Sequence, residues 1–298
     1  TPKANRMKRG KSRRLFKKKK SHSNQRLGCI IAIIVLIPIC YGLYLYYQQY
    51  SVQHSSKPQI ETSVSLPTPS GKDLEIPVSL IPRQEQIIRH KGYTVSYNKD
   101  LKIPNWVSYE LTRQETKGKE KRGDNFIADP LVKGAIATNA DYARSGYDKG
   151  HMAPAADMKW SPDAMKESFY FSNMCPQHPQ LNRRGWKNLE EKIRDWAVAD
   201  SAIIIICGPI IDKPSKTIGK NKVPVPERFF KVILSPFVKP ARGIGFLFNN
   251  RQAVEPLSTY AVSIDSIEKL THMDFFSPLP DEIENAVEAN ADYYQWPR

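Results

Sequence analysis

Asp141–Asp157 reads DYARSGYDKGHMAPAAD and is the part of the chain richest in side chains capable of chemistry. Charged residues alternate there with the turn-forming residues Gly146, Gly150 and Pro154. His151 follows a glycine in this polar turn, where solvent and substrate can reach its imidazole. The ordinary pKa of an imidazole, about 6.5, allows it to accept a proton near neutrality. A structural histidine held by hydrogen bonds is the competing interpretation, so the surrounding sequence has to decide.

The segment Asn173–Glu191, NMCPQHPQLNRRGWKNLEE, leads into a predicted helix. Asn182 lies just before that helix, and Glu190 and Arg194, four residues apart, share one of its faces. The helix is predicted from a single apolar stripe with helical spacing, formed by Trp186, Leu189, Ile193, Trp196 and Ala197. A histidine, an amide and a carboxylate are therefore supplied by two separate segments.

Together these two segments resemble the DNA/RNA non-specific endonucleases, the ββα-metal (His-Me finger) nucleases that include endonuclease G. The signature of that family is D-R-G-H, followed downstream by an asparagine ahead of a helix. Asp148–His151 and Asn182 match it here, and the similarity continues in Val225–Val232 and Asp274–Phe276. It covers roughly residues 80–281. The resemblance implies an α+β fold with a central, mostly antiparallel sheet flanked by helices.

The resemblance also implies a role for each matching residue. His151 matches the general base that takes a proton from the attacking water. Asn182 matches the single protein ligand of the catalytic metal, expected to be Mg²⁺ with Mn²⁺ as a substitute, and Glu190 matches the acid that orients the metal-bound waters. Arg122 occupies the position of an arginine that stabilises transition-state charge, and Arg194 is expected to face the phosphate.

One residue departs from the signature, because Lys149 stands where the family has arginine. Lysine keeps the positive charge but lacks the planar fork that binds two oxygens at once. Since the base and the metal ligand are both present, we expect a working enzyme. The resemblance implies cleavage of both DNA and RNA with little sequence preference, 5′-phosphate products and an expected homodimer.

The order of the remaining elements favours the α+β class, because strands and helices do not alternate as in βαβ units. Ala202–Cys207, AIIIIC, is stopped by Gly208-Pro209 and predicts a buried central strand. Asp281–Ala289 predicts a second, shorter helix. Other strands are predicted at Thr94–Tyr97, Asn105–Leu111, Ser168–Asn173, Phe229–Leu234 and Gly245–Phe248. A hydrophobic fraction of 40% and only four cysteines exclude a disordered, collagenous or disulfide-scaffold chain.

The N-terminal part consists of a basic tail, an apolar run and a polar stretch. Residues 1–27 hold twelve Lys or Arg and no acid, and without them the formal net charge of +15 falls to +3. Gly28–Tyr47 is uncharged over twenty residues, long enough for a transmembrane helix. Positive charge before this span predicts a cytoplasmic tail and a periplasmic or extracellular catalytic domain. Residues 48–73 are predicted as a flexible stalk and residues 74–298 as the endonuclease domain.

Alternatives exist for the anchor and for the function. A cleaved signal peptide has a shorter apolar region of about 7–15 residues, whereas an organelle transit peptide is basic and poor in acids, as this tail is. The length of the run favours a retained anchor. Instead of an enzyme, the chain could be a catalytically impaired, membrane-tethered protein that binds nucleic acid. A third hypothesis is a scaffold whose basic tail binds anionic lipid.

Several other residues were weighed for function. His178 is interpreted as structural, since one neutral base suffices, and His90 has no partner pattern around it. Cys175 and Cys207 could pair in an oxidising compartment, but the sequence does not place their Cα atoms. A phosphate-tracking surface and an ordinary solvated face are equally good interpretations of six basic residues: Lys117, Lys119, Lys121, Arg183, Arg184 and Lys187.

Overall fold

The structure, a computed structural model, describes residues 60–62, 74–211 and 216–298. The chain divides into two compact units, residues 1–56 and 57–298, and only the second contains described residues. The predicted basic tail and membrane span therefore lie outside the described residues, as does most of the predicted stalk. Within the described ranges, no helix combines the length and apolar character needed to cross a membrane.

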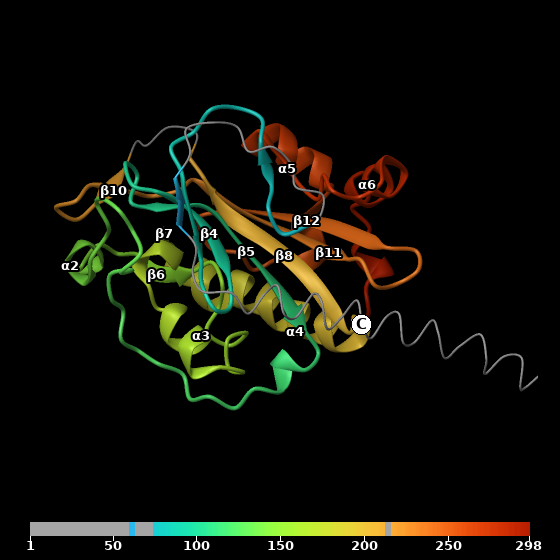
Figure 1. Cartoon of the computed structure of the whole chain (residues 1–298), viewed down its shortest axis with the longest axis horizontal. Helices are drawn as coiled ribbons and strands as arrows, with labels where there is room; N and C mark the ends of the chain where they lie inside the picture. The colour runs from blue at the N-terminus through green and yellow to red at the C-terminus, as the bar shows by residue number, and fades with distance from the viewer. Residues whose placement is uncertain (1–59, 63–73, 212–215) are drawn as a thin grey trace, which may run out of the picture. The chain divides into compact units, whose positions relative to one another are not determined.

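An antiparallel sheet of eight strands forms the centre of the described unit (Figure 1). Neighbouring strands pair antiparallel throughout it, with β8 and β5 in the middle. The spatial order is β1 (Ile60–Thr62), β3 (Gln86–Arg89), β4 (Thr94–Asn98), β5 (Ile103–Thr112), β8 (Ala202–Ile210), β11 (Arg228–Ser235), β12 (Arg242–Asn249) and β13 (Ala261–Val262). β1 lies within the stretch predicted as a stalk.

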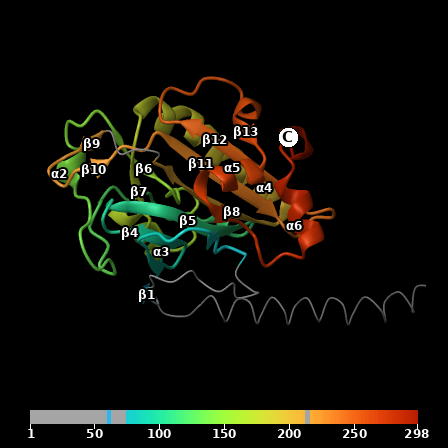
Figure 2. The same ribbon diagram turned by 90° about the horizontal axis from the view of Figure 1, so that it is seen from above.

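Side chains on the two faces of the sheet form two separate cores. Along β8 they alternate, because Ile203 and Ile205 belong to one core while Ile204 and Ile206 belong to the other. Helix α4 (Lys187–Asp200) packs on the first face through its predicted apolar stripe. Helices α5 (Ile264–Thr271) and α6 (Asp281–Glu288) contribute to the second core. Figures 1 and 2 show α4 on one side of the sheet and α5 and α6 on the other.

The smaller elements lie around this sheet. Two-stranded pairs are formed by β14 with β2, by β10 with β9 and by β6 with β7. The bounds of these elements are β2 Val78–Ser79, β6 Asp148–His151, β7 Met174–Gln177, β9 Thr217–Ile218, β10 Val223–Pro224, β14 Met273–Asp274, α2 Asn139–Tyr142, α3 Pro162–Glu167, η1 Glu115–Lys117, η2 Phe171–Asn173, η3 Leu181–Trp186, η4 Leu257–Tyr260 and η5 Tyr293–Gln295.

A ββα unit lies on the α4 side and contains both segments singled out from the sequence. β6 pairs antiparallel with β7, and the chain then enters η3, a π-helical turn that continues directly into α4. Asn182, expected just ahead of the helix, lies inside this turn. The backbone carbonyl of His178 accepts hydrogen bonds from the N–H groups of Leu181 and Asn182, both at 2.9 Å, which fixes the start of the turn.

The predicted strand at Ser168–Asn173 is wrong, whereas the other predicted strands and both predicted helices are confirmed. Ser168 and Phe169 follow α3 in a turn, Tyr170 forms an isolated bridge with Ile127, and the 3₁₀ turn η2 ends at Asn173. The amide nitrogen of Asn173 donates to the carbonyls of Ala153 and Ser168, both at 2.8 Å, so a side chain replaces the backbone partner that a strand would need. The strand begins one residue later, at Met174.

Candidate active site

His151 is the last residue of β6 and lies opposite Met174 of β7. Its backbone carbonyl accepts a hydrogen bond from Trp186 Nε1 at 3.3 Å, which ties the strand to the end of η3. The preceding Gly150 is required by packing, since a Cβ there would lie 2.6 Å from Cβ of Gln177. The position of the histidine is therefore set by the hairpin on one side and the helix entrance on the other.

The imidazole of His151 is buried, with 8% of the residue exposed, between two aromatic rings. Its ring centroid lies 5.5 Å from that of Phe126 and 5.0 Å from that of Phe169. Nε2 is buried without a hydrogen-bond partner, so the expectation that solvent reaches the imidazole is wrong for this conformation. Burial, followed by the positive charges of Arg122 and Lys149, lowers the pKa of His151 to about 3. The ring is therefore neutral at physiological pH, which is the protonation state a general base needs.

Asp148, at the other end of β6, holds the amide of Asn182. Asn182 Nδ2 donates to Asp148 Oδ2 at 2.9 Å, and because a carboxylate only accepts, the amide oxygen must point away from it. Arg183 binds the same carboxylate with two nitrogens, at 2.8 and 2.7 Å. The Arg183 side chain is largely exposed to solvent, and an exposed ion pair contributes little to stability. Its main effect is to orient the Asp148 carboxylate.

The groups around Asn182 fit a hard divalent cation. The described residues supply no hydrogen-bond donor to its Oδ1, so a neutral oxygen ligand is available there. Mg²⁺ dehydrates reluctantly and is usually held by one or two protein oxygens together with several waters. Asn182 would hold such an ion directly, and Glu190 would hold its waters.

Glu190 lies on the first turn of α4 and is partly buried against the sheet. The pKa of Glu190 is raised to about 7, mainly by burial and in part by the negative charge of Asp157. The positive charges of Lys231, Arg194 and Arg122 act in the opposite direction. The charge of Arg122 thus acts on both Glu190 and His151. Arg122 itself is exposed, and its guanidinium carbon lies 5.5 Å from the centre of the Phe169 ring.

Lys231 is a functional candidate that the sequence analysis did not single out. It lies on β11, is fully buried and has no hydrogen-bond partner for Nζ, which sits 4.5 Å from the centre of a Trp186 ring. Its neighbours two residues away on the strand, Phe229 and Ile233, belong to the core beneath α4. The lysine therefore brings a positive charge under Glu190. The one sequence signal was a lysine inside an otherwise apolar strand.

Arg194 forms an ion pair with buried Asp157, with Nη1 2.8 Å from Oδ1. The other oxygen of Asp157 accepts from the hydroxyl of Tyr109 at 2.9 Å. The buried carboxylate of Asp157 thus has hydrogen-bond partners for both oxygens. Burial of Arg194 lowers its pKa, but the attraction of Asp157 outweighs this and the pKa is raised. Its guanidinium is engaged with this carboxylate, and a direct contact with phosphate stays a prediction.

Lys149 extends across the mouth of the site. Its Nζ donates to Asn139 Oδ1 at 2.9 Å and lies 4.2 Å from the centre of the Phe126 ring. Partial burial lowers the pKa of the Lys149 amine. The side chain thus keeps Phe126 against His151 and places a positive charge beside it. The six basic residues weighed as a phosphate-tracking surface are all exposed.

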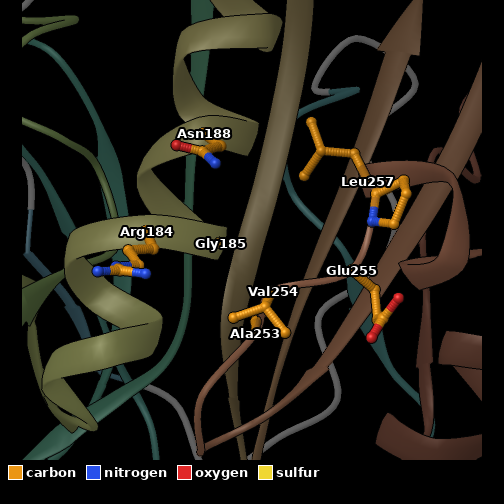
Figure 3. A pocket seen from close by; sticks show the side chains of 8 residues that line it. Arg184, Gly185, Asn188, Ala253, Val254, Glu255 and Leu257 are labelled. Atoms are coloured by element: carbon orange, nitrogen blue, oxygen red, sulfur yellow. The ribbon is translucent and has the colours of Figure 1, made fainter.

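A pocket lies beside the ββα unit, between the start of α4 and the loop after β12 (Figure 3). Arg184 and Asn188 project from successive turns of the helix, and Val254 and Leu257 face them from the loop. Gly185 allows this close approach, since a Cβ there would lie 2.6 Å from Ala253 Cβ. His151 and Glu190 do not line this pocket. Its exposed Arg184 is available to nucleic acid near the site.

The remaining candidates from the sequence have structural positions. His178 Nδ1 accepts a hydrogen bond from the backbone of Gln180, in keeping with its predicted structural role. Cys175 and Cys207 are buried free thiols, so they do not form a disulfide. His90, which showed no pattern, is paired with Asp129 at 2.9 Å in a buried cluster remote in sequence from β6.

Comparison with known proteins identifies the class. The model of the DNA/RNA non-specific endonuclease family matches residues 70–282. A nuclease of Nostoc sp. is 30% identical over 250 residues, covering 79% of this chain and 88% of that protein. Human mitochondrial endonuclease G is 33% identical over 213 residues, covering 65% and 71%. A solved structure of an EndoG/EndoGI complex, which concerns EndoG inhibition, matches with TM-score 0.63 and 28% identity over 72% of this chain and 94% of that one.

This chain belongs to the DNA/RNA non-specific endonuclease family. Its mixed fold with a central antiparallel sheet matches that of an EndoG-like nuclease. It is accordingly an enzyme that hydrolyses phosphodiester bonds of nucleic acid, and its family is metal-dependent.

Proposed function

We propose that the chain is a Mg²⁺-dependent endonuclease that cleaves DNA and RNA without sequence preference and leaves 5′-phosphate ends. The observation that carries this proposal is that β6 ends in His151 and begins with Asp148, which holds Asn182. His151 offers a neutral, unpartnered imidazole nitrogen, and Asn182 offers an amide oxygen, which Asp148 leaves free. A base and an oxygen ligand are the two components that metal-assisted hydrolysis requires.

In the proposed mechanism, Nε2 of His151 takes a proton from the water that attacks phosphorus. The pKa of about 3 keeps the imidazole in its basic form, and protonation is aided when the phosphate brings negative charge beside it. Asn182 would hold a metal ion whose positive charge would supply stabilisation for the negative charge that develops on the phosphate and the leaving oxygen. Ionised Glu190 accepts hydrogen bonds from ordered water on the same side.

The cationic residues hold the substrate. The charges of Arg122 and Lys149 both lower the pKa of His151, so a phosphate beside this base would be attracted by two positive charges. Backbone contacts of this type carry no sequence information, which accounts for cleavage without sequence preference. The lysine in place of the family arginine keeps the charge, and we propose that activity survives the exchange.

The proposed location is an extracytoplasmic one. Residues 28–47 would anchor the chain, with residues 1–27 in the cytoplasm and the nuclease domain in the periplasm or outside the cell. The exclusion of the enzyme from the cytoplasm would separate it from cellular nucleic acid. A reporter fused after Arg298 tests this orientation, since activity only in the cytoplasm would overturn it.

Cleavage assays with purified chain test the reaction. Supercoiled plasmid and a single-stranded RNA are each incubated with Mg²⁺, with Mn²⁺ or with chelator, and the DNA ends are tested for direct ligation. We expect cleavage of both substrates, loss in chelator, and ligatable 5′-phosphate ends. Asn182→Ala should abolish cleavage, whereas Asn188→Ala, an amide one to two turns further along the same helical segment, should not. Tight binding without cleavage under any divalent metal would contradict the proposal.

A further inference from the structure

A second group of acidic side chains lies far from His151, on the opposite side of the sheet. It is formed by Asp265 and Glu268 of α5, Asp274 of β14, and Glu284 and Glu288 of α6. In each of two overlapping triads, the carboxylate oxygens lie within 4.8 Å of one another, and Glu288 is common to both. Three consecutive elements near the C-terminus thus bring two acidic triads together around Glu288.

Glu288 distinguishes this group from an ordinary solvated acidic surface. Only 6% of the residue is exposed, and its Oε1 is buried without a hydrogen-bond partner. A buried carboxylate oxygen is normally paired with a donor or a cation, because leaving it desolvated and unpaired is costly. Within the part of the chain that the structure describes, no lysine or arginine forms an ion pair with any member of the group.

The electrostatic environment of Glu288 is negative. Burial and then the carboxylates of Glu268, Glu284, Asp274 and Asp265 raise the pKa of Glu288 to about 9. Glu284 and Glu288 are four residues apart on α6, a spacing at which like charges repel. A fold that brings these groups together therefore needs either protons or a cation between them.

Carboxylate oxygens within 4.8 Å of one another in each triad can share one cation. Calcium suits such a group because it takes six to eight oxygen ligands, binds carboxylates readily and accepts irregular geometry. One oxygen of Glu268 is already held by the backbone N–H of Phe275 at 2.8 Å, which fixes this carboxylate in position and leaves its second oxygen for a ligand role.

We propose that Glu288, together with Glu268, Asp265, Asp274 and Glu284, binds a calcium ion that is separate from the catalytic metal. The site joins α5, β14 and α6, and α5 and α6 both pack against β12. Its role is structural, since it neutralises the carboxylates that would otherwise drive the C-terminal helices apart. The nuclease would then have two divalent-cation sites with different chemistry, one for catalysis and one for stability.

The test uses the full chain carrying Asn182→Ala, which removes the proposed catalytic ligand. Calcium and magnesium are titrated separately by calorimetry into chelator-stripped protein, and thermal unfolding is measured with and without Ca²⁺. Glu288→Gln is the test variant, and Glu282→Gln is the matched control, because Glu282 is an exposed acid on the first turn of α6 outside both triads.

We expect one calcium ion per chain in the parent and in Glu282→Gln, and none in Glu288→Gln. At a hundredfold excess over Kd, calcium should raise the Tm of the parent by about 5–10 °C. With calcium, the parent should therefore have a higher Tm than Glu288→Gln. In chelator, Glu288→Gln should have the higher Tm, because the substitution removes repulsion among the carboxylates. A role for Glu288 in ordinary packing would not give this inversion.

Other outcomes would overturn the proposal. Calcium binding that persists in Glu288→Gln would place the ion elsewhere, and absence of binding in the parent would mean that protons alone neutralise the group. Binding of Mg²⁺ but not Ca²⁺ would overturn the assignment to calcium. If Glu288→Gln does not fold, the double variant Asp265→Asn, Glu284→Gln takes its place, since it removes one ligand from each triad.

Discussion

Replacing Lys231 by methionine should make the protein more stable and less active. Lys231 is fully buried and its Nζ has no hydrogen-bond partner, so the folded state bears a desolvation penalty of several kcal/mol. Methionine has a similar length, and it forfeits a cation–π contact with Trp186 worth about 2 kcal/mol. Lys231 also attracts the carboxylates of Glu190 and Asp157, and losing this attraction offsets part of the gain. We therefore expect the free energy of unfolding to rise by about 1 kcal/mol and the Tm by about 2–4 °C.

The loss of activity in Lys231→Met should depend on pH through Glu190. With a pKa of about 7, Glu190 is half ionised at neutral pH, and removing the positive charge beneath it raises that pKa. A rise of about one unit, equivalent to about 1.4 kcal/mol, leaves about one tenth ionised at pH 7 and slows cleavage about fivefold. At pH 9 the carboxylate is ionised in both proteins, so their rates should converge.

The assay is single-turnover plasmid cleavage from pH 6 to pH 9 at saturating Mg²⁺, combined with thermal unfolding of each variant. Glu190→Gln provides the control, because Lys231→Met should have little further effect on the rate once position 190 cannot ionise. A loss of activity that is constant across pH, or a lower Tm, would refute the reasoning about Lys231.

Three further substitutions test the supports of the site. Asp148→Ala should weaken the apparent Mg²⁺ affinity measured in cleavage titrations by about 10–100-fold, because Asn182 loses its orientation; unchanged affinity would contradict this. Gly150→Ala should lower the free energy of unfolding in urea by about 1–3 kcal/mol, since its Cβ would collide with Gln177, and an unchanged midpoint would disprove the clash. Lys149→Arg should keep the cleavage rate within about threefold of wild type if the residue supplies positive charge, whereas a tenfold gain would show that bidentate binding matters.

The regular parts of the fold could be predicted because their patterns are local. Ala202–Cys207 is apolar over its whole length and forms a strand buried from both faces, and the stripe on α4 has helical spacing. Ser168–Asn173 has the aromatic residues that favour a strand, but the side chain of Asn173 supplies hydrogen bonds that stabilise a turn instead. The hydrogen bond of the Asn173 side chain to Ala153 joins residues twenty apart, so the local sequence does not indicate it.

The site was predictable only where it matched a motif. The signature predicts roles for His151 and Asn182, but the dependence of Asn182 on Asp148 comes from a contact between residues 34 apart. Lys231 could not be assigned from its neighbours, since only the packing of β11 under α4 reveals that its charge meets Glu190. Glu288 likewise acquires its surroundings from α5 and β14, which precede it by many residues.

Chemical rescue of His151→Ala tests the central claim most directly, because it asks whether an imidazole at this place takes the proton. Plasmid cleavage by His151→Ala is measured with Mg²⁺ in the presence and absence of added imidazole. We predict a loss of about 10²–10⁴-fold, partly restored by imidazole in proportion to its neutral form. Cleavage within a few-fold of wild type, or a large loss that imidazole leaves unchanged while the fold stays intact, would contradict the account.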